Sequence, residues 1–312
     1  MVGRLRWEAE ASREHAAPPA WKGWKMALDF SVLVIAHQRH GHLQRLLDGV
    51  NRSALLPAEI IVAYMDEPDP EPVESALPVT SVHVASYPGE QGLPLARARN
   101  HAAKHARSRY LVFLDVDCIP APDAFGILLD WLRRQPVLAM AEPRYLAQPL
   151  GPGPTPDAEE LTRRSASHHL RAKLPMDTHC QRHEMFWSLG FGIRAEDFVR
   201  LGGFSTGYAG YGAEDTDFGF KARALGLPVV FTQGTVFHQH HGVVKPPLNH
   251  FDDIIQNART FRNTWHGWPM SGWLRAFKER GLVTWDPQGE DLRILRHPSA
   301  EEIRAAHSMD PY

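Results

Sequence analysis

The sequence predicts an α/β fold in which a mostly parallel sheet is flanked by helices. Two observations carry this prediction. Short apolar runs rich in β-branched residues alternate with helical stretches in the first half of the chain, and polar residues follow directly where the strands end. The order strand, helix, strand, strand, helix, strand is typical of parallel strands joined by crossover helices. In such sheets ligands gather at the carboxyl ends of the strands.

The first half of the chain supplies four predicted strands and two predicted helices. In order, they are a strand in residues 30–40, a helix carrying Leu43, Leu46, Leu47 and Val50, strands in residues 58–68 and 79–86, a helix in residues 93–108, and a strand in residues 108–120. The second helix has Ala98, Ala102 and Ala106 at four-residue spacing, which forms a close-packing face. Residues whose side chains can bind a ligand or take part in catalysis therefore stand at predicted strand ends: His37, Arg39, Asp66, Asp115 and Asp117.

The second half begins after a Pro/Gly-rich break in residues 147–160. Residues 186–204 predict a strand, a short helix and a glycine turn. A glycine-rich loop then enters a helix whose apolar face carries Phe218, Ala222 and Leu225 and which Gly226 ends. Residues 228–241 predict two short strands, and residues 249–281 are helical and rich in tryptophan.

This pattern predicts three parts of the chain. They are an N-terminal extension in residues 1–27, a main domain in residues 28–245 with halves at 28–146 and 161–245, and a helical C-terminal extension in residues 246–312.

The composition is that of a soluble globular protein. The 312 residues are 43% hydrophobic and 22% charged with a net charge of −2, and the dispersed positive charge gives no reason to expect nucleic acid. Two cysteines cannot form a disulfide framework and suit a reducing cytoplasm. No apolar run approaches the roughly 18 residues of a bilayer span, and no signal peptide pattern opens the chain. We therefore expect a cytoplasmic protein.

The N-terminal extension carries three tryptophans among basic residues. This composition is a weak interfacial signal and is compatible with peripheral membrane association. The alternative is an extension that packs its tryptophans on the body of the protein, and we favour that alternative.

Asp115 and Asp117 follow the fourth predicted strand. Alternate residues of a strand point the same way, so both carboxylates can face one site across Val116. Two adjacent carboxylates repel each other unless a cation or hydrogen-bond donors neutralise them, and such oxygen ligands suit Mg²⁺ or Mn²⁺. Aspartates also occur in turns and at helix caps, so these two residues alone leave both readings open.

The motif FHQHH ends the last predicted strand. On a strand, His238 and His240 share a face and can donate an imidazole to the cation that the aspartates hold, which shifts the preference from Mg²⁺ towards Mn²⁺. Surface histidines in a histidine-rich chain are the alternative. The hypothesis of an independent zinc site has less support, because neither cysteine lies near the histidines in sequence.

Glu214 and Asp215 begin the helix that follows the Gly/aromatic loop. A carboxylate beside a bound sugar hydroxyl is what a general base requires, and the loop can approach a ligand and stack on a sugar ring. The helix macrodipole alone also favours acids at this position. On the helix before the double aspartate, Arg97 and Asn100 lie three residues apart and can point together at an anionic or polar ligand, with a solvated helix face as the alternative.

Together these motifs resemble a GT-A-fold glycosyltransferase. The first half is similar to family-2 members: a strand entering AHQRH, a strand ending in Asp66, an Arg/Asn-bearing helix, and a DxD motif written DVD. The second half resembles the C-terminal region of β-1,4-galactosyltransferases and polypeptide N-acetylgalactosaminyltransferases, in the stretch GGFSTGYAGYGAEDTDFGFKARALG and the downstream HQH. The resemblance spans about residues 30–241.

The resemblance implies a metal-dependent, inverting transfer of a hexose or N-acetylhexosamine from a UDP-sugar to an acceptor hydroxyl. It implies Asp117 as a ligand of Mn²⁺ or Mg²⁺, with His238 or His240 completing the protein ligands. Asp215 is implied as the catalytic base and Glu214 as a ligand of the acceptor hydroxyl.

The resemblance also implies a nucleotide site. Asp115 contacts the ribose or the metal-bound phosphates, Asp66 bonds the uracil, and Arg39 and Arg97 lie near the nucleotide. The complete expected nucleotide-binding set is His37, Arg39, Asp66, Arg97, Asn100 and Asp115. The acceptor stays open among a saccharide, a lipid-linked intermediate, a peptide and a small metabolite.

Several departures from the family pattern leave the nucleotide and the sugar open. The first strand leads into AHQR where PTYNR is commoner, the second ends in one acid instead of two, and Tyr208 and Tyr211 stand where galactosyltransferases carry Trp. Three other functions remain as alternatives. A nucleotidyltransferase would need a glycine-rich loop near the first strand, which this sequence lacks. A non-catalytic sugar-binding protein could share the fold, and a zinc hydrolase would leave the aspartates without a role.

Overall fold

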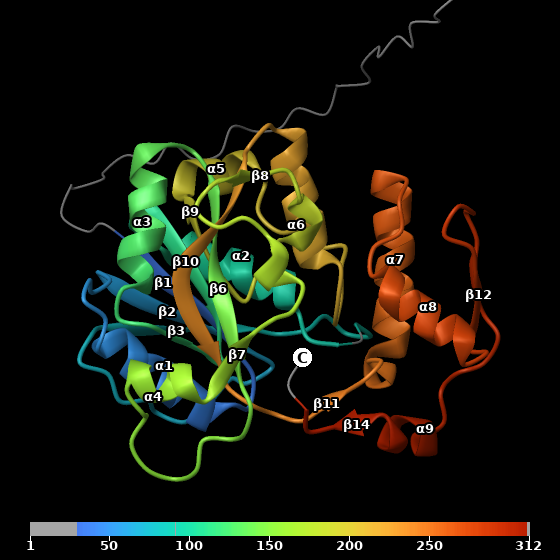
Figure 1. The fold of residues 1–312 in the computed structure, drawn as a ribbon, viewed down its shortest axis with the longest axis horizontal. Helices are drawn as coiled ribbons and strands as arrows, with labels where there is room; N and C mark the ends of the chain where they lie inside the picture. Colours follow the sequence, from blue (N-terminus) through green and yellow to red (C-terminus); the bar gives the residue numbers. More distant parts are fainter. Residues whose placement is uncertain (1–29, 91, 311–312) are drawn as a thin grey trace, which may run out of the picture.

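The computed structural model describes residues 30–90 and 92–310 (Figure 1). The predicted N-terminal extension, residues 1–27, lies outside the described residues together with its tryptophans. Within the described ranges, no helix is both long enough and apolar enough to cross a membrane.

A large sheet forms the centre of the fold. Its strands are β1 (Phe30–Ala36), β2 (Glu59–Met65), β3 (Val79–Val84), β4 (Tyr110–Asp115), β5 (Cys118–Pro120), β6 (Leu138–Leu146), β7 (Ser165–Ser167), β8 (His179–Cys180), β9 (Gly190–Arg194) and β10 (Val229–His238). The main order is β3-β2-β1-β4-β9-β6-β10-β5, with β7 paired to β6 and β8 to β10. The first four of these strands are parallel, and β6 and β10 run in the same direction, while β9 and β5 are antiparallel to their neighbours. The predicted fold class is confirmed.

Helices cover both faces of this sheet (Figure 1). On one face, α1 (His40–Asn51) and α3 (Ala124–Arg134) pack with the side of β1 that carries Val32 and Val34. On the other face, α2 (Leu95–His105), α5 (Ala195–Arg200) and α6 (Glu214–Ala224) pack with the side that carries Leu33 and Ile35. Burial on both faces explains why β1 and β2 are apolar almost throughout and do not alternate.

Two predicted details differ from the structure. Residues 228–241 contain one long strand, β10, in place of two short ones, and its pairing with β6 is irregular between Phe231 and Thr235. The irregularity lies between the two apolar runs that the sequence analysis predicted as separate strands. Leu225, predicted on the buried face of a helix, lies just beyond the end of α6 and is exposed.

The connecting segments contain three short helices. They are α4 (Ala158–Arg163), η1 (Arg171–Lys173) and η2 (His183–Met185). They lie between β6 and β9, and α4 begins inside the predicted Pro/Gly-rich break.

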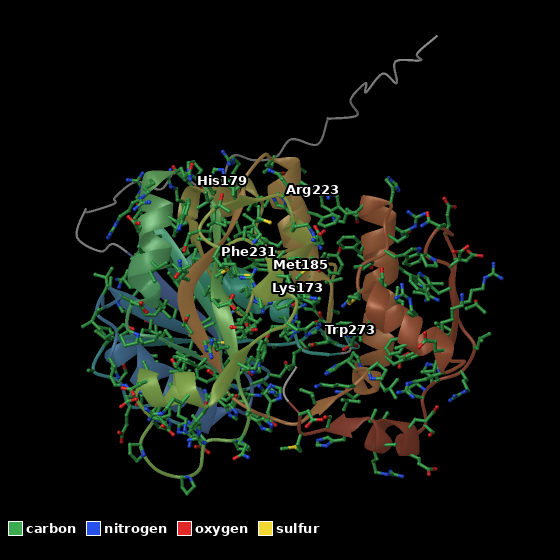
Figure 2. All side chains as sticks on the ribbon, in the orientation of Figure 1. Lys173, His179, Met185, Arg223, Phe231 and Trp273 are labelled. Carbon is green, nitrogen blue, oxygen red and sulfur yellow. The ribbon has the colours of Figure 1, made fainter. Side chains whose placement is uncertain are left out.

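The C-terminal part stands beside the sheet domain and has its own apolar cluster, which includes Phe251, Leu274 and Phe277. Its helices are η3 (Leu248–His250), α7 (Phe251–Trp265), α8 (Ser271–Glu279) and α9 (Ala300–Ala305). Two small sheets accompany them: β11 (Val243–Val244) with β14 (His307–Ser308), and β12 (Val283–Trp285) with β13 (Leu292–Ile294). Figure 2 shows Trp273 of α8 at the side of this part that faces the sheet domain.

Candidate active site

A histidine and carboxylate cluster lies where β10 ends. Asp117, just beyond β4, has its Oδ1 atom 3.6 Å from His238 Nε2 and its Oδ2 atom 3.4 Å from His241 Nε2. One ligand atom from each of the three residues lies within 4.8 Å of the others. Arg39, which precedes α1, also contacts the Asp117 carboxylate. One oxygen and two imidazole nitrogens form a donor set that suits a divalent transition metal better than Mg²⁺.

The charge states of these groups fit metal binding. Burial alone would raise the pKa of Asp117, but the neighbouring His238, His241 and Arg39 outweigh burial and hold the pKa well below its usual range. Burial lowers the pKa of His238 and so favours its neutral form. An ionised carboxylate and a neutral imidazole are the forms that bind metals.

The structure brings two of the three sequence-predicted metal ligands together and adds one. Asp117 and His238 lie in the cluster, and His241 joins them. The Nε2 atom of His240 instead lies 2.6 Å from the carbonyl oxygen of Met309. The alternation that paired His238 with His240 applies only within a strand, and β10 ends at His238. The adjacent histidines were visible in the sequence, but the turn that selects His241 was not.

A buried arginine joins the two acidic motifs. Arg99 Nη2 donates to Asp115 Oδ1 at 2.9 Å, and Arg99 Nη1 donates to Glu214 Oε1 at 3.3 Å. The Arg99 side chain is only 4% exposed. Burial would lower the pKa of Arg99, but the carboxylates of Asp115 and Glu214 raise it, so the guanidinium stays charged. It therefore ties the end of β4 to the start of α6.

Sequence reasoning missed Arg99, although the sequence carried a signal. Its helical position groups with Ala96, Ala102 and Ala103, which are all buried on the inner face of α2. An arginine among inward-facing alanines must have a buried partner, because an unpaired buried charge is costly. That argument would have selected Arg99 ahead of Arg97 and Asn100, which are only partly buried.

Glu214 and Asp215 occupy the first turn of α6. Burial raises the pKa of both carboxyl groups, and the Glu214 carboxylate adds to the effect on Asp215, whose pKa reaches about 7. The Oε2 atom of Glu214 is buried and has no hydrogen-bond partner within the described part of the chain. A base with a pKa near neutrality beside an unsatisfied carboxylate oxygen suits a ligand hydroxyl and its proton.

The Gly/aromatic loop before α6 is anchored from within the protein. The Tyr208 hydroxyl donates to Asp217 Oδ1 at 3.2 Å, and Trp265 Nε1 donates to the same oxygen at 2.8 Å. The Tyr211 ring stacks on His250 with a centroid distance of 4.5 Å and on Trp273 at 5.6 Å. Both tyrosines thus hold the loop in place against the protein's own residues.

The C-terminal part also holds this loop through side-chain hydrogen bonds to the loop's backbone. The Asn257 amide on α7 donates to the carbonyl oxygens of Ala209 and Gly212, each at 2.9 Å. A Cβ on Gly210 would lie 2.2 Å from an Asp253 carboxylate oxygen, so only glycine fits there. The loop conformation next to Glu214 therefore depends on α7.

Two predicted nucleotide residues stand at the carboxyl ends of neighbouring strands. His37 Nδ1 lies 2.7 Å from the carbonyl oxygen of Met65, after β1 and at the end of β2. The Asp66 carboxylate accepts hydrogen bonds from the Ser86 backbone N–H and hydroxyl, both at 2.6 Å. Of the other two strand-end residues, Arg39 contacts Asp117 and Asp115 pairs with Arg99.

Arg97 and Asn100 do not converge on one ligand. Arg97 forms two hydrogen bonds to the Glu90 carboxylate at 2.8 and 2.7 Å. Asn100 instead holds Phe204, donating to its carbonyl oxygen and accepting from its N–H, both at 2.8 Å. These contacts assign the Asn100 side chain to bracing the glycine turn before the aromatic loop.

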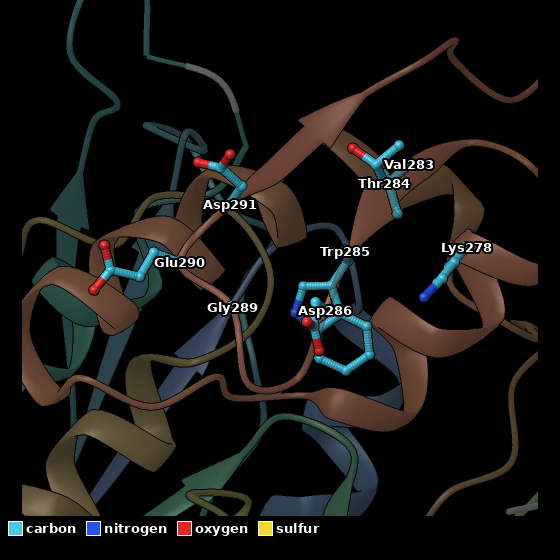
Figure 3. Close-up of a pocket in the computed structure, with 8 residues that line it drawn as sticks. All are labelled: Lys278, Val283, Thr284, Trp285, Asp286, Gly289, Glu290 and Asp291. Atoms are coloured by element: carbon cyan, nitrogen blue, oxygen red, sulfur yellow. The ribbon is translucent and has the colours of Figure 1, made fainter.

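A pocket of about 630 Å³ lies elsewhere, on the hairpin of β12 and β13 (Figure 3). It is lined by Lys278, Val283, Thr284, Trp285, Asp286, Gly289, Glu290 and Asp291. None of the predicted site residues lines it.

Two family models match the chain. Residues 31–185 match the family described as glycosyl transferase family 2, and residues 168–242 match the family described as the N-terminal domain of galactosyltransferase. These matches confirm the two-part resemblance seen in the motifs.

Curated relatives and solved structures are also similar to this chain. Validoxylamine A glucosyltransferases of Streptomyces hygroscopicus subsp. limoneus and of Streptomyces hygroscopicus subsp. jinggangensis (strain 5008) are 26% and 27% identical over 241 residues. Each match covers 69% of this chain, but 51% and 55% of the respective relative, so the chain spans about half the length of the curated relatives it matches.

Among solved structures, GalNAc-T7 with UDP, GalNAc and Mn²⁺ has a TM-score of 0.50 at 16% identity, covering 75% of this chain and 48% of that one. Residues 1–349 of S. aureus TarS give a TM-score of 0.48 at 14% identity, covering 76% of this chain and 66% of that one.

Proposed function

We propose that this chain is a GT-A-fold glycosyltransferase that transfers a hexose or N-acetylhexosamine from a UDP-sugar to an acceptor hydroxyl in a metal-dependent, inverting reaction. The single observation that carries the proposal is the meeting of two groups at the carboxyl end of the sheet. One is the Asp117, His238 and His241 cluster, and the other is the Asp115–Arg99–Glu214 bridge that leads to Asp215.

The cluster supports a divalent cation in the site. Asp117, His238 and His241 would hold it, and the two imidazoles favour Mn²⁺ over Mg²⁺. When bound, such a cation neutralises negative charge on a departing diphosphate. His240, which the sequence also suggested as a ligand, has a protein partner in this structure. The effect of a His241 substitution on Mn²⁺ affinity tests the assignment.

The proposed acid–base chemistry belongs to α6. Asp215 takes the proton of the acceptor hydroxyl, and its raised pKa of about 7 suits that task. The free Oε2 atom of Glu214 accepts a hydrogen bond from an acceptor hydroxyl. Arg99 holds the other Glu214 oxygen and so fixes the carboxylate in place. A single displacement assisted by one base inverts the anomeric carbon.

We assign the nucleotide to the strand ends that carry His37, Arg39, Asp66 and Asp115. Arg97 pairs with Glu90, whereas Asn100 holds the glycine turn through Phe204 and so leaves the proposed nucleotide set. Glucose is the first sugar to test, with validoxylamine A as one acceptor, because two relatives carry that activity in their names.

The test is incubation with UDP-glucose, UDP-galactose and UDP-N-acetylgalactosamine, each with Mn²⁺ or with EDTA, followed by detection of released UDP. We expect slow hydrolysis of one donor with Mn²⁺ and none with EDTA. NMR of the product with an acceptor should show the inverted anomer. If no nucleotide binds with or without metal, the proposal fails. Donor binding without hydrolysis or transfer to any acceptor class would favour a non-catalytic sugar-binding protein.

A further inference from the structure

The C-terminal end of the described chain lies directly against the histidine motif. Strand β14 pairs antiparallel with β11, which begins two residues after His241, and this pairing sets Val243 opposite Ser308. The backbone N–H of Lys245 donates to the carbonyl oxygen of Ala306 at 2.8 Å. In Figure 1, β11 and β14 lie side by side at the edge of the sheet domain.

His240 contacts this C-terminal segment with its side chain. Its Nε2 atom lies 2.6 Å from the Met309 carbonyl oxygen, and the residue is buried. On the other side of His240, the Gln239 backbone N–H donates to the Asp117 carbonyl oxygen at 2.7 Å, and its amide donates to the His42 carbonyl oxygen at 2.9 Å. The turn is thus held by the sheet domain before His240 and by the C-terminal segment from His240 onwards.

Gly242 shows how closely the two segments pack. A Cβ atom at this position would lie 2.5 Å from His307 Nε2 and 2.8 Å from its Cε1, closer than real Cβ contacts allow. The imidazole of His307 therefore occupies the space that any larger residue at position 242 would need. With glycine at this position the turn and β14 fit each other without a shift of the His307 side chain.

We propose that β14 and Met309 are a positioning element of the metal site. They hold residues 240–242 in the turn that directs His241 at Asp117 and turns His240 away from it. The inference rests on the proposed function, because it assigns a role to C-terminal residues in the cation site proposed there. It adds that the C-terminal segment, more than sixty residues from the histidine motif in sequence, sets the affinity of that site.

The decisive experiment removes the hydrogen-bond acceptor without touching the histidines. A chain that ends after Ser308 lacks the Met309 carbonyl but retains the β11–β14 pairing residues. Binding of Mn²⁺ alone, measured by electron paramagnetic resonance without nucleotide, should weaken by about tenfold relative to the full chain, as is typical when a group that orients metal ligands is lost. His240→Ala should weaken binding to a similar degree, and combining it with the truncation should add little.

The outcomes separate the two proposals. If the full chain does not bind Mn²⁺, the metal site of the proposed function fails and the inference falls with it. If the full chain binds Mn²⁺ and the truncated chain binds it equally well, only the inference is overturned. A loss with His240→Ala but none with the truncation would make His240 a direct ligand and would also overturn the inference.

A second pair of variants tests the Gly242 contact. Gly242→Ala should weaken Mn²⁺ binding, and adding His307→Ala should restore much of it by opening space for the new methyl group. Gly272→Ala in α8 is the matched control, because no atom lies within 4 Å of its added Cβ. Failure of His307→Ala to restore a folded Gly242→Ala variant would refute the proposed contact. If Gly242→Ala does not fold, the truncation decides the question.

Discussion

Replacing Arg99 by methionine should destabilise the protein strongly, and the loss should depend on pH. The guanidinium lies 2.9 Å from Asp115 and 3.3 Å from Glu214. With an effective dielectric constant of about 20, these separations correspond to attractions of roughly 6 and 5 kcal/mol. Much of this lost attraction is offset, because the variant no longer has to transfer a charged guanidinium from water into the protein interior. We therefore expect a net loss of about 3–5 kcal/mol in the free energy of unfolding, the range for a broken buried ion pair.

The sign of the pH dependence follows from the two carboxyl groups that remain. Without Arg99, burial raises the folded-state pKa values of Asp115 and Glu214 further above their unfolded values. Groups with raised pKa values stabilise the folded state while protonated, and that stability is lost as the pH rises through the folded pKa. The deficit of Arg99→Met relative to the native chain should therefore be smaller near pH 5 than near pH 8.

Urea unfolding followed by circular dichroism at both pH values measures this deficit. Arg97→Met is the matched control on the same helix, because Arg97 pairs with Glu90 outside the buried bridge. That variant should lose about 1 kcal/mol and show no such trend with pH. A loss below about 1 kcal/mol for Arg99→Met near pH 8, without dependence on pH, would refute the buried bridge.

Further substitutions test the catalytic, metal and structural assignments. Asp215→Asn should lower transfer by about 10²–10⁴-fold while calorimetry shows nearly unchanged UDP affinity, and a lost affinity would remove Asp215 from the base role. In the native chain, kcat/KM should rise with pH up to about 7 and then level off, because the base must be deprotonated; a flat profile down to pH 5 would contradict this. His241→Ala should weaken Mn²⁺ binding at least tenfold, whereas His101→Ala, on the remote part of α2, should not; equal affinities would exclude His241 as a ligand. Asn100→Ala should cost about 1–3 kcal/mol in urea unfolding because it leaves the buried Phe204 backbone without partners, and a neutral effect would mean that water replaces the amide.

The local sequence pattern was sufficient to predict the sheet and the polar residues that follow the ends of its strands. Strands buried on both faces must be continuous apolar runs, so β1, β2 and β4 were recognisable from the sequence. Their ends placed Asp66 and Asp117 at one edge of the sheet. The strand that ends at His238 was equally visible, although its irregular centre made one strand resemble two.

By itself, then, the sequence determined the fold class, the resemblance to GT-A glycosyltransferases, and the motifs from which a site can be built. The tertiary structure alone decided which members of each motif meet. Arg99 joins Asp115 and Glu214, which lie 16 and 115 residues away in sequence. Helix and strand periodicity relates only residues a few positions apart, so it cannot predict these pairs. His241 reaches Asp117 because β10 stops at His238 and the following turn packs against Met309. Side-chain direction follows from backbone periodicity only within a helix or strand, and beyond its end packing against the rest of the molecule sets it.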